Sequence, residues 1–167
     1  MATINLEEWA APLAGLPVDV QIALWKNLAG RSINPSTVYQ VPFLCSTAAI
    51  APAAGGNATG AWNFDTVTCI YGISGVQTVA AVARSLQGIA VTTRNGAWPW
   101  LGTPTQPLNM GGVPDISLGA QDYLGVAPTV ALQNEAWNCQ ITNNDVAASN
   151  VFMYLQGVQL FTPGGGF

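Results

Sequence analysis

Four carboxylates lie near the ends of segments with strand patterns, and these side chains are the best placed for acid–base chemistry: Asp65, Asp115, Asp122 and Glu135. Glycoside hydrolysis needs two carboxyl groups about 5 to 10 Å apart, and no spacing here brings two of them together. The chain has no histidine, so a serine or cysteine nucleophile lacks its usual general base. We therefore expect no catalytic residues and no enzyme activity.

The three cysteines, Cys45, Cys69 and Cys139, are the next candidates for chemistry. Their spacing does not match Cys-x-x-Cys, and without histidine a zinc site of these three thiolates would need a distant carboxylate as its fourth ligand. Cys69 and Cys139 fall at inward positions of alternating segments, which indicates small buried hydrophobic residues. Residues 143–145, Asn-Asn-Asp, offer oxygen atoms for calcium, but such a run is more typical of a hairpin turn. The sequence predicts no metal site and no cofactor.

Trp98 and Trp100 flank a proline at the start of a segment rich in proline and glycine, residues 98–114. Tryptophans held on a stiff loop are able to stack on sugar rings, as in a carbohydrate-binding module. They are also common anchors of a loop against a neighbouring subunit. We favour the anchoring interpretation and keep sugar binding as an alternative.

The clearest elements that would position these residues are two strands near the end of the sequence. Residues 135–142 alternate between apolar and polar side chains, which predicts a half-buried strand. A polar turn then leads to residues 151–161, which are apolar on both faces. One face is expected to carry Phe152, Tyr154, Val158 and Leu160, and the other Val151, Met153, Leu155 and Phe161. Such a strand must be covered twice, by the core and by a second sheet, a helix or another subunit.

The preceding chain contains one convincing helix and several strand patterns. Pro17 suits a first helical position and Gly30 a helix stop, so a helix is expected over residues 17–29. Its apolar stripe would be Val18, Ile22, Trp25 and Ala29, with Leu28 beside it. Strand patterns occupy residues 37–44, 62–73, 88–93 and 123–126. Residues 46–61 are expected to form a loop, and residues 75–87 fit either a short helix or a strand.

Turn signals separate these patterns at the spacing of a β-sandwich or barrel with roughly seven to nine strands. We divide the chain into a helical arm over residues 1–34, a β-sandwich over residues 35–163 and a flexible glycine-rich tail over residues 164–167. Pro42 requires its strand to lie at an edge or to contain a bulge. The fold class expected from the pattern is mainly β.

Composition points to self-association. Charged residues make up 7% of the chain, against about 25% in an ordinary soluble protein. A surface with so few charges tends to associate, so we expect a homo-oligomer. The cationic side chains are Lys26, Arg31, Arg84 and Arg94, too few and too scattered for nucleic acid. No apolar run is long enough to span a membrane, and the absence of a signal-peptide pattern favours synthesis in a cytoplasm.

The closing pair of segments, residues 135–145 and 150–161, resembles the last two strands of small jelly-roll proteins in tailed-bacteriophage virions. Cement, decoration and vertex proteins of this kind often end in a polar turn and an apolar strand that contains a glycine, here Gly157, followed by Val158 and Leu160. The resemblance implies a single jelly-roll β-sandwich, often trimeric, that bridges subunits of the major capsid protein. It brings no catalytic residues.

Together these patterns predict a non-enzymatic capsid cement, decoration or minor capsid protein, made in the host cytoplasm and assembled into the virion. The alternatives are a lattice-forming single jelly-roll capsid protein and a carbohydrate-binding module. The candidate interface residues are Met153, Leu155, Phe161, Trp98, Trp100, Ile22 and Trp25.

Overall fold

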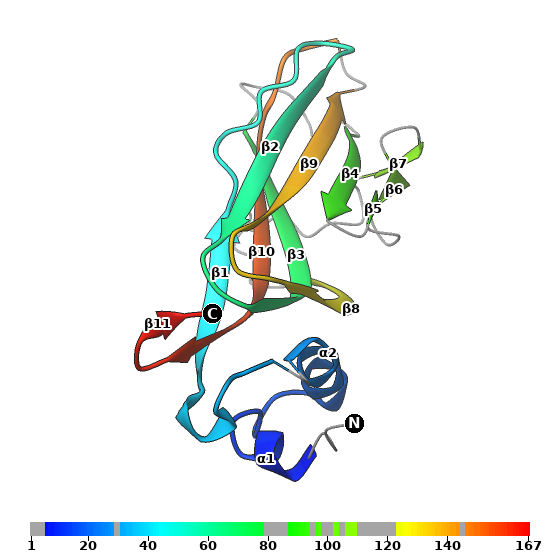
Figure 1. Cartoon of the computed structure of the whole chain (residues 1–167). Coiled ribbons are helices and arrows are strands. Elements are labelled where there is room, and N and C mark those ends of the chain that lie inside the picture. The colour runs from blue at the N-terminus through cyan, green and yellow to red at the C-terminus, as the bar shows by residue number, and fades with distance from the viewer. Residues whose placement is uncertain are drawn as a thin grey trace.

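The computed structural model describes residues 6–28, 31–78, 87–93, 96–97, 102–103, 106–109, 123–143 and 146–167. Two antiparallel sheets face each other, and two helices lie at one end of them (Figure 1). The protein is therefore mainly β and built as a sandwich, as the sequence predicts.

The first sheet has the strand order β1-β10-β3-β8. Its strands are β1 (Tyr39–Ser46), β10 (Asn150–Thr162), β3 (Thr68–Thr78) and β8 (Leu124–Ala131), and the short β11 (Gly165–Gly166) pairs with β10. Of the ambiguous segment over residues 75–87, residues 75–78 belong to β3 and Gln87 begins the strand β4. Residues 79–86 lie outside the described residues.

The second sheet has the order β2-β9-β4-β7-β6. Its strands are β2 (Asn57–Phe64), β9 (Glu135–Asn143), β4 (Gln87–Thr93), β7 (Gln106–Asn109) and β6 (Gly102–Thr103), and β5 (Gly96–Ala97) pairs with β4. The expected loop over residues 46–61 is wrong in its last part, because β2 begins at Asn57. Its small residues alternate between an exposed and a covered face, a pattern that the sequence reading took for turn composition.

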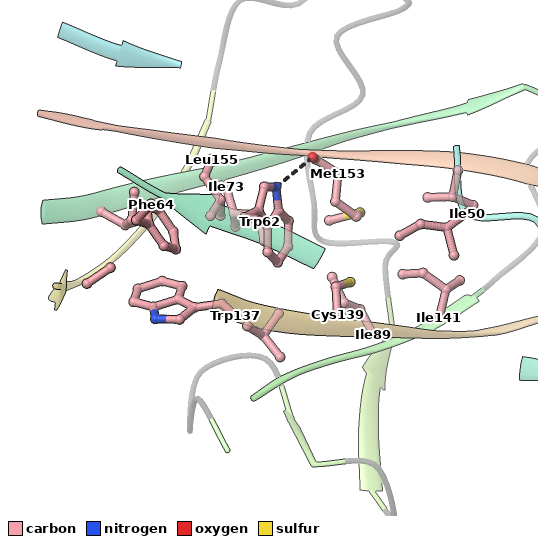
Figure 2. Packing of buried hydrophobic residues seen from close by; sticks show 14 residues of the cluster. Ile50, Trp62, Phe64, Ile73, Ile89, Trp137, Cys139, Ile141, Met153 and Leu155 are labelled. Atoms are coloured by element: carbon pink, nitrogen blue, oxygen red, sulfur yellow. Dashed lines mark hydrogen bonds between the residues drawn. The ribbon is translucent and has the colours of Figure 1, made fainter. Parts of the chain in front are cut away.

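The larger core, here called the sheet-covered core, fills the space between the two sheets. Its biggest fully buried side chains are Trp62 and Phe64 from β2 and Trp137 from β9. The rings of Phe64 and Trp137 meet edge to face with centroids 5.1 Å apart, a favourable aromatic geometry. The indole Nε1 of Trp62 donates a hydrogen bond of 3.2 Å to the main-chain oxygen of Met153 on β10 (Figure 2). This bond joins the two sheets through the core.

β10 has a cover on each face, over different parts of the strand, while Phe152 and Tyr154 are only half-buried. Val151, Met153 and Leu155 lie in the sheet-covered core. Val158 and Leu160, on the opposite face, lie in a second cluster with residues of the helices, here called the helix-covered core. One chain therefore supplies both covers at these positions, a sheet on one side and a helix on the other.

A register shift in β3 changes the predicted faces of that strand. Alternation over the predicted strand of residues 62–73 places Val67, Cys69, Tyr71 and Ile73 on one side. The structure divides that segment between β2 and β3, which belong to different sheets. In the structure, the pairing of β3 with β10 shifts between Ile70 and Gly72, so one extra residue is inserted in β3. Ile73 consequently joins Ile70 in the sheet-covered core, while Cys69 stays in the helix-covered core. Such a bulge reverses the alternation of every later residue.

The helices are α1 (Leu6–Ala10) and α2 (Val18–Leu28), followed by the 3-10 turn η1 (Pro35–Thr37). The apolar stripe that the sequence indicates on α2 exists, but it is exposed at Val18 and Ile22, and a second stripe is buried in the core. The buried residues are Val20, Leu24 and Leu28, whose spacing of four also places them on one face. They pack into the helix-covered core with Val130, Val158 and Leu160. The segment predicted as a helical arm is thus docked on its own sheet.

The glycine-rich end that was expected to be flexible is tied to the sandwich. Gly165 adopts φ +119°, a conformation open to glycine, and lets β11 fold back on β10. The carbonyl oxygen of Phe167 accepts a hydrogen bond of 2.8 Å from the main-chain N–H of Val67. The hydroxyl of Thr66 accepts one of 3.0 Å from the N–H of Phe167. These bonds fasten the segment beside the start of β3.

Candidate interaction surfaces

An open apolar pocket of about 230 Å³ lies between the two helices. It is lined by Trp9, Ala10, Leu13, Val18, Gln21, Ile22 and Trp25. The predicted interface residues Ile22 and Trp25 therefore meet in one place, together with side chains from α1 that the sequence reading did not include. Six of these lining residues are hydrophobic, and Gln21 is polar.

The turn between α1 and α2 fixes the shape of this pocket. The main-chain N–H of Leu13 donates to the carbonyl of Trp9 over 3.2 Å, which extends α1 by a turn. Gly15, with φ +84°, then reverses the chain. The side-chain amide of Gln21 donates to the carbonyl of Leu16 over 2.7 Å. The pocket walls are held by these local bonds and by the burial of the opposite face of α2.

Two hydrophobic side chains of the pocket lining are well exposed, whereas Trp9 and Leu13 are buried. Val18 is 71% exposed and Ile22 is 46% exposed. The indole N–H of Trp25 is buried and has no hydrogen-bond partner in the described part of the chain, and an unpaired buried donor is costly. Val18 and Ile22 give the pocket its exposed apolar surface.

Met153 and Leu155 do not form an outer surface. Both are 0% exposed in the single chain and lie in the sheet-covered core (Figure 2). The expectation that they contact another subunit is wrong, because the second sheet already covers them. The apolar pattern of β10 does not distinguish a cover within the chain from a cover by another chain.

Phe161 is half-buried at the end of β10, where its ring stacks on Tyr39 with centroids 6.0 Å apart. Tyr39, the first residue of the edge strand β1, is 50% exposed, so this pair forms a small apolar patch where β1 begins and β10 ends. The other candidates, Trp98 and Trp100, lie outside the described residues.

The outer face of the second sheet is a further surface, which the sequence reading missed. Along β2 and β9 it displays Asn57, Thr59, Ala61, Asn63, Ala136, Asn138, Gln140 and Thr142. At β4 this face is covered, because Ala90, which pairs with Gln140, is 1% exposed. Within the described strands, no residue on this face carries a charge. Alternating Asn, Thr and Gln in two neighbouring strands was the signal that could have identified it.

Among the four candidate carboxylates, Glu135 forms hydrogen bonds that give it a structural role. The carboxylate of Glu135 accepts hydrogen bonds from the indole Nε1 of Trp137, 2.8 Å, and from the N–H of Leu132, 2.9 Å. It thereby stabilises the turn between β8 and β9, in which Asn134 has φ 61°. Asp115 and Asp122 lie outside the described residues. No group of three or more potential metal ligands occurs among the residues that the structure describes.

The three cysteines are free thiols. Burial raises the pKa of Cys139 to about 12, and burial with a smaller contribution from Asp19 raises that of Cys69 to about 12. Burial, followed by the Asp65 carboxylate, also raises the pKa of the half-buried Cys45. All three are protonated at neutral pH, and a protonated thiol is a poor nucleophile or metal ligand.

Within the described ranges, no helix has both the length and the apolar character needed to cross a membrane. The chain matches no family model, no curated protein and no solved structure.

Proposed function

We propose that this protein is a non-enzymatic structural protein of a bacteriophage virion. It is a capsid cement, decoration or minor capsid protein that self-associates and bridges neighbouring capsid subunits. Its architecture in this proposal is a single jelly roll, as the resemblance of its closing strands implies.

The observation that carries the proposal is the nesting of the strand pairs. Strand β1 pairs with β10, β2 with β9, β3 with β8, and β4 with β7. A chain paired in this nested way corresponds to one long hairpin rolled into two facing sheets. Jelly rolls have eight strands in two interleaved Greek keys, and they are typical of viral capsid and lectin domains.

Because one fold serves many functions, the surface must distinguish the role. The described outer face of the second sheet is uncharged, and the helical pocket exposes Val18 and Ile22. The exposed apolar side chains favour contact with another protein surface, and the uncharged face brings no charge repulsion to such a contact. The pocket is the surface that we propose for contact with a capsid subunit.

The test compares two exposed valines. Val18→Asp places a charge in the pocket wall, and an acidic residue in the first turn of α2 suits the helix dipole, so the fold should persist. Val146→Asp introduces the same change at a valine that is 95% exposed and far along the chain from the helices. We expect Val18→Asp to weaken binding to capsids at least about tenfold, with Val146→Asp binding like the wild type. Cosedimentation with purified capsids, imaged by electron microscopy, measures this.

Equal capsid binding by both variants would contradict the pocket as the contact surface. Absence of wild-type binding to any capsid would contradict the virion role. Closed shells formed by the chain alone would identify the alternative of a lattice-forming capsid protein. The sugar-binding alternative depends on Trp98 and Trp100, and no observation on the described residues favours it.

A further inference from the structure

The two sheets differ in how their edge strands are protected. β1 and β2 each have one neighbour, β10 and β9 respectively, and each leaves its other side open. Edge strands expose main-chain N–H and C=O groups that are ready to pair with another strand. Proteins commonly block such edges with proline, charged side chains or bulges.

β1 carries such a block. The N–H of Thr47 donates to the carbonyl of Met153 over 2.9 Å, and bonded pairs alternate along an antiparallel ladder. The register of β1 with β10 therefore turns the odd-numbered residues of β1 toward β10 and the even-numbered ones toward the open edge. Pro42 is one of the outward residues. Its missing N–H interrupts the row of donors in the middle of the strand.

β2 carries no such block. The N–H of Asn143 donates to the carbonyl of Gly56 over 2.8 Å, so the even-numbered residues of β2 bond to β9. The outward residues are Asn57, Thr59, Ala61 and Asn63. β2 contains no proline and no charged residue, and its register with β9 has no shift. Its open edge is a continuous row of donors and acceptors.

This row is unoccupied in the described part of the chain, where no hydrogen bond reaches the main-chain groups of those four residues. The segment that connects β1 to β2 runs near this edge (Figure 1). Its own hydrogen bonds go to the other sheet, from Thr47 to Met153 and from Ile50 to Val151. The neighbouring segment therefore does not satisfy the β2 edge.

We propose that β2 of one copy pairs antiparallel with β2 of a second copy across a two-fold axis at Gly60. In this register Asn57 faces Asn63 of the other copy, and Thr59 faces Ala61 of the other copy. All four outward residues then exchange main-chain hydrogen bonds with outward residues. The two second sheets become one continuous sheet through the dimer.

The side chains of β2 favour a second copy as the partner. A two-fold contact must be complementary to itself, and this strand brings no like charges together. Small residues, Gly60, Ala61 and Thr59, lie at the axis, and the amides of Asn57 and Asn63 meet at both ends, where they are able to hydrogen bond. A strand with charged side chains would find no opposite charge on this face.

The test uses two alanine-to-lysine substitutions on the same exposed face. Ala61→Lys charges the open edge of β2, and Ala136→Lys charges the interior strand β9, where the side chain is likewise exposed. We expect the wild type to form a dimer in a concentration-dependent way. The dissociation constant of this dimer should rise at least about tenfold in Ala61→Lys. Ala136→Lys should match the wild type. Light scattering and sedimentation velocity over a wide concentration range measure the mass, and circular dichroism checks that each variant is folded.

Amide hydrogen exchange gives a second measurement that needs no substitution. On dimerisation the N–H groups of Thr59 and Ala61 should exchange at least about tenfold more slowly, whereas those of Ala58 and Gly60 are already bonded to β9 and should change little. Equal masses for the two lysine variants, or no concentration dependence at the odd-numbered amides, would overturn the pairing.

This inference rests on the self-association in the proposed function, but the two fail separately. If the wild type binds capsids but Ala61→Lys does not change self-association, the virion role is supported and the β2 contact is contradicted. A β2 dimer that binds no capsid retains the contact and loses the virion role.

Discussion

The two faces of β10 are covered in different ways. On one face, the sheet-covered core holds large aromatic residues and a hydrogen bond from Trp62 that joins both sheets. On the other, the helix-covered core depends on helices of 5 and 11 residues, beside an open pocket. Helices below about 12 to 15 residues are marginal by themselves. Thus the helix layer depends on its contacts with the sheet, whereas the sandwich has a core of its own.

This difference changes how an apolar strand is interpreted. The double apolar pattern of β10 indicates two covers, and the chain provides both. Exposure of a second stripe on α2, including Val18 and Ile22, is the better sign of an outside partner. The helices and the open edge of β2 are therefore the surfaces that the proposed assembly would use.

The sheet-covered core is broken most strongly by Met153→Asp. Met153 is 0% exposed, and a carboxylate there has no room for water or a counter-charge. We expect a loss of at least about 4 kcal/mol in the free energy of unfolding, or failure to fold. Leu44→Asp is the matched control on the neighbouring strand, since Leu44 is 61% exposed, and should cost less than about 1 kcal/mol. Urea unfolding followed by tryptophan fluorescence measures both, and equal losses would contradict the assignment of Met153 to the core.

The helix-covered core is tested by Leu24→Ala. Leu24 is 0% exposed in α2, and truncation should cost about 2 to 5 kcal/mol through the cavity that it leaves. Ile22→Ala, on the exposed stripe of the same helix, should cost less than about 1 kcal/mol. Thermal unfolding by circular dichroism measures the two. If Ile22→Ala lowered the free energy of unfolding more than Leu24→Ala does, the stripe with Val18 and Ile22 would be the buried one.

Thiol labelling sharpens the comparison with the smallest perturbation, because each core contains one buried cysteine. Cys69 lies in the helix-covered core and Cys139 in the sheet-covered core, and burial holds the pKa of both at about 12. At pH 8 both react only through opening of the protein. If the helices detach before the sandwich unfolds, Cys69 should be alkylated at least about tenfold faster than Cys139.

Peptide mapping by mass spectrometry after iodoacetamide treatment separates the two sites. Cys45 is half-buried and serves as the internal reference for a thiol that needs less opening. Identical rates at Cys69 and Cys139 would mean that the two cores open as one cooperative unit.

Local alternation predicted the fold class and the two faces of β10 correctly. It failed at Ile73, because the extra residue in β3 arises from pairing with β10 and has no signal in the sequence. It failed at α2 because two apolar stripes exist on that helix, and the one that is buried depends on the shape of the sheet. For Met153 and Leu155 the pattern predicted burial correctly. The expectation that another subunit covers them was wrong, because the second sheet of the same chain does so.

By itself, the sequence determined that the chain is mainly β, that β10 needs two covers and that few charges reach the surface. Those properties follow from composition and from the fixed period of a strand, which act between near neighbours. The tertiary structure alone decided which element covers each face, which stripe of α2 is exposed and that the open edge of β2 lacks the proline that interrupts β1. These features depend on pairing between residues far apart in the chain, such as Gly56 with Asn143, and no local pattern encodes that pairing.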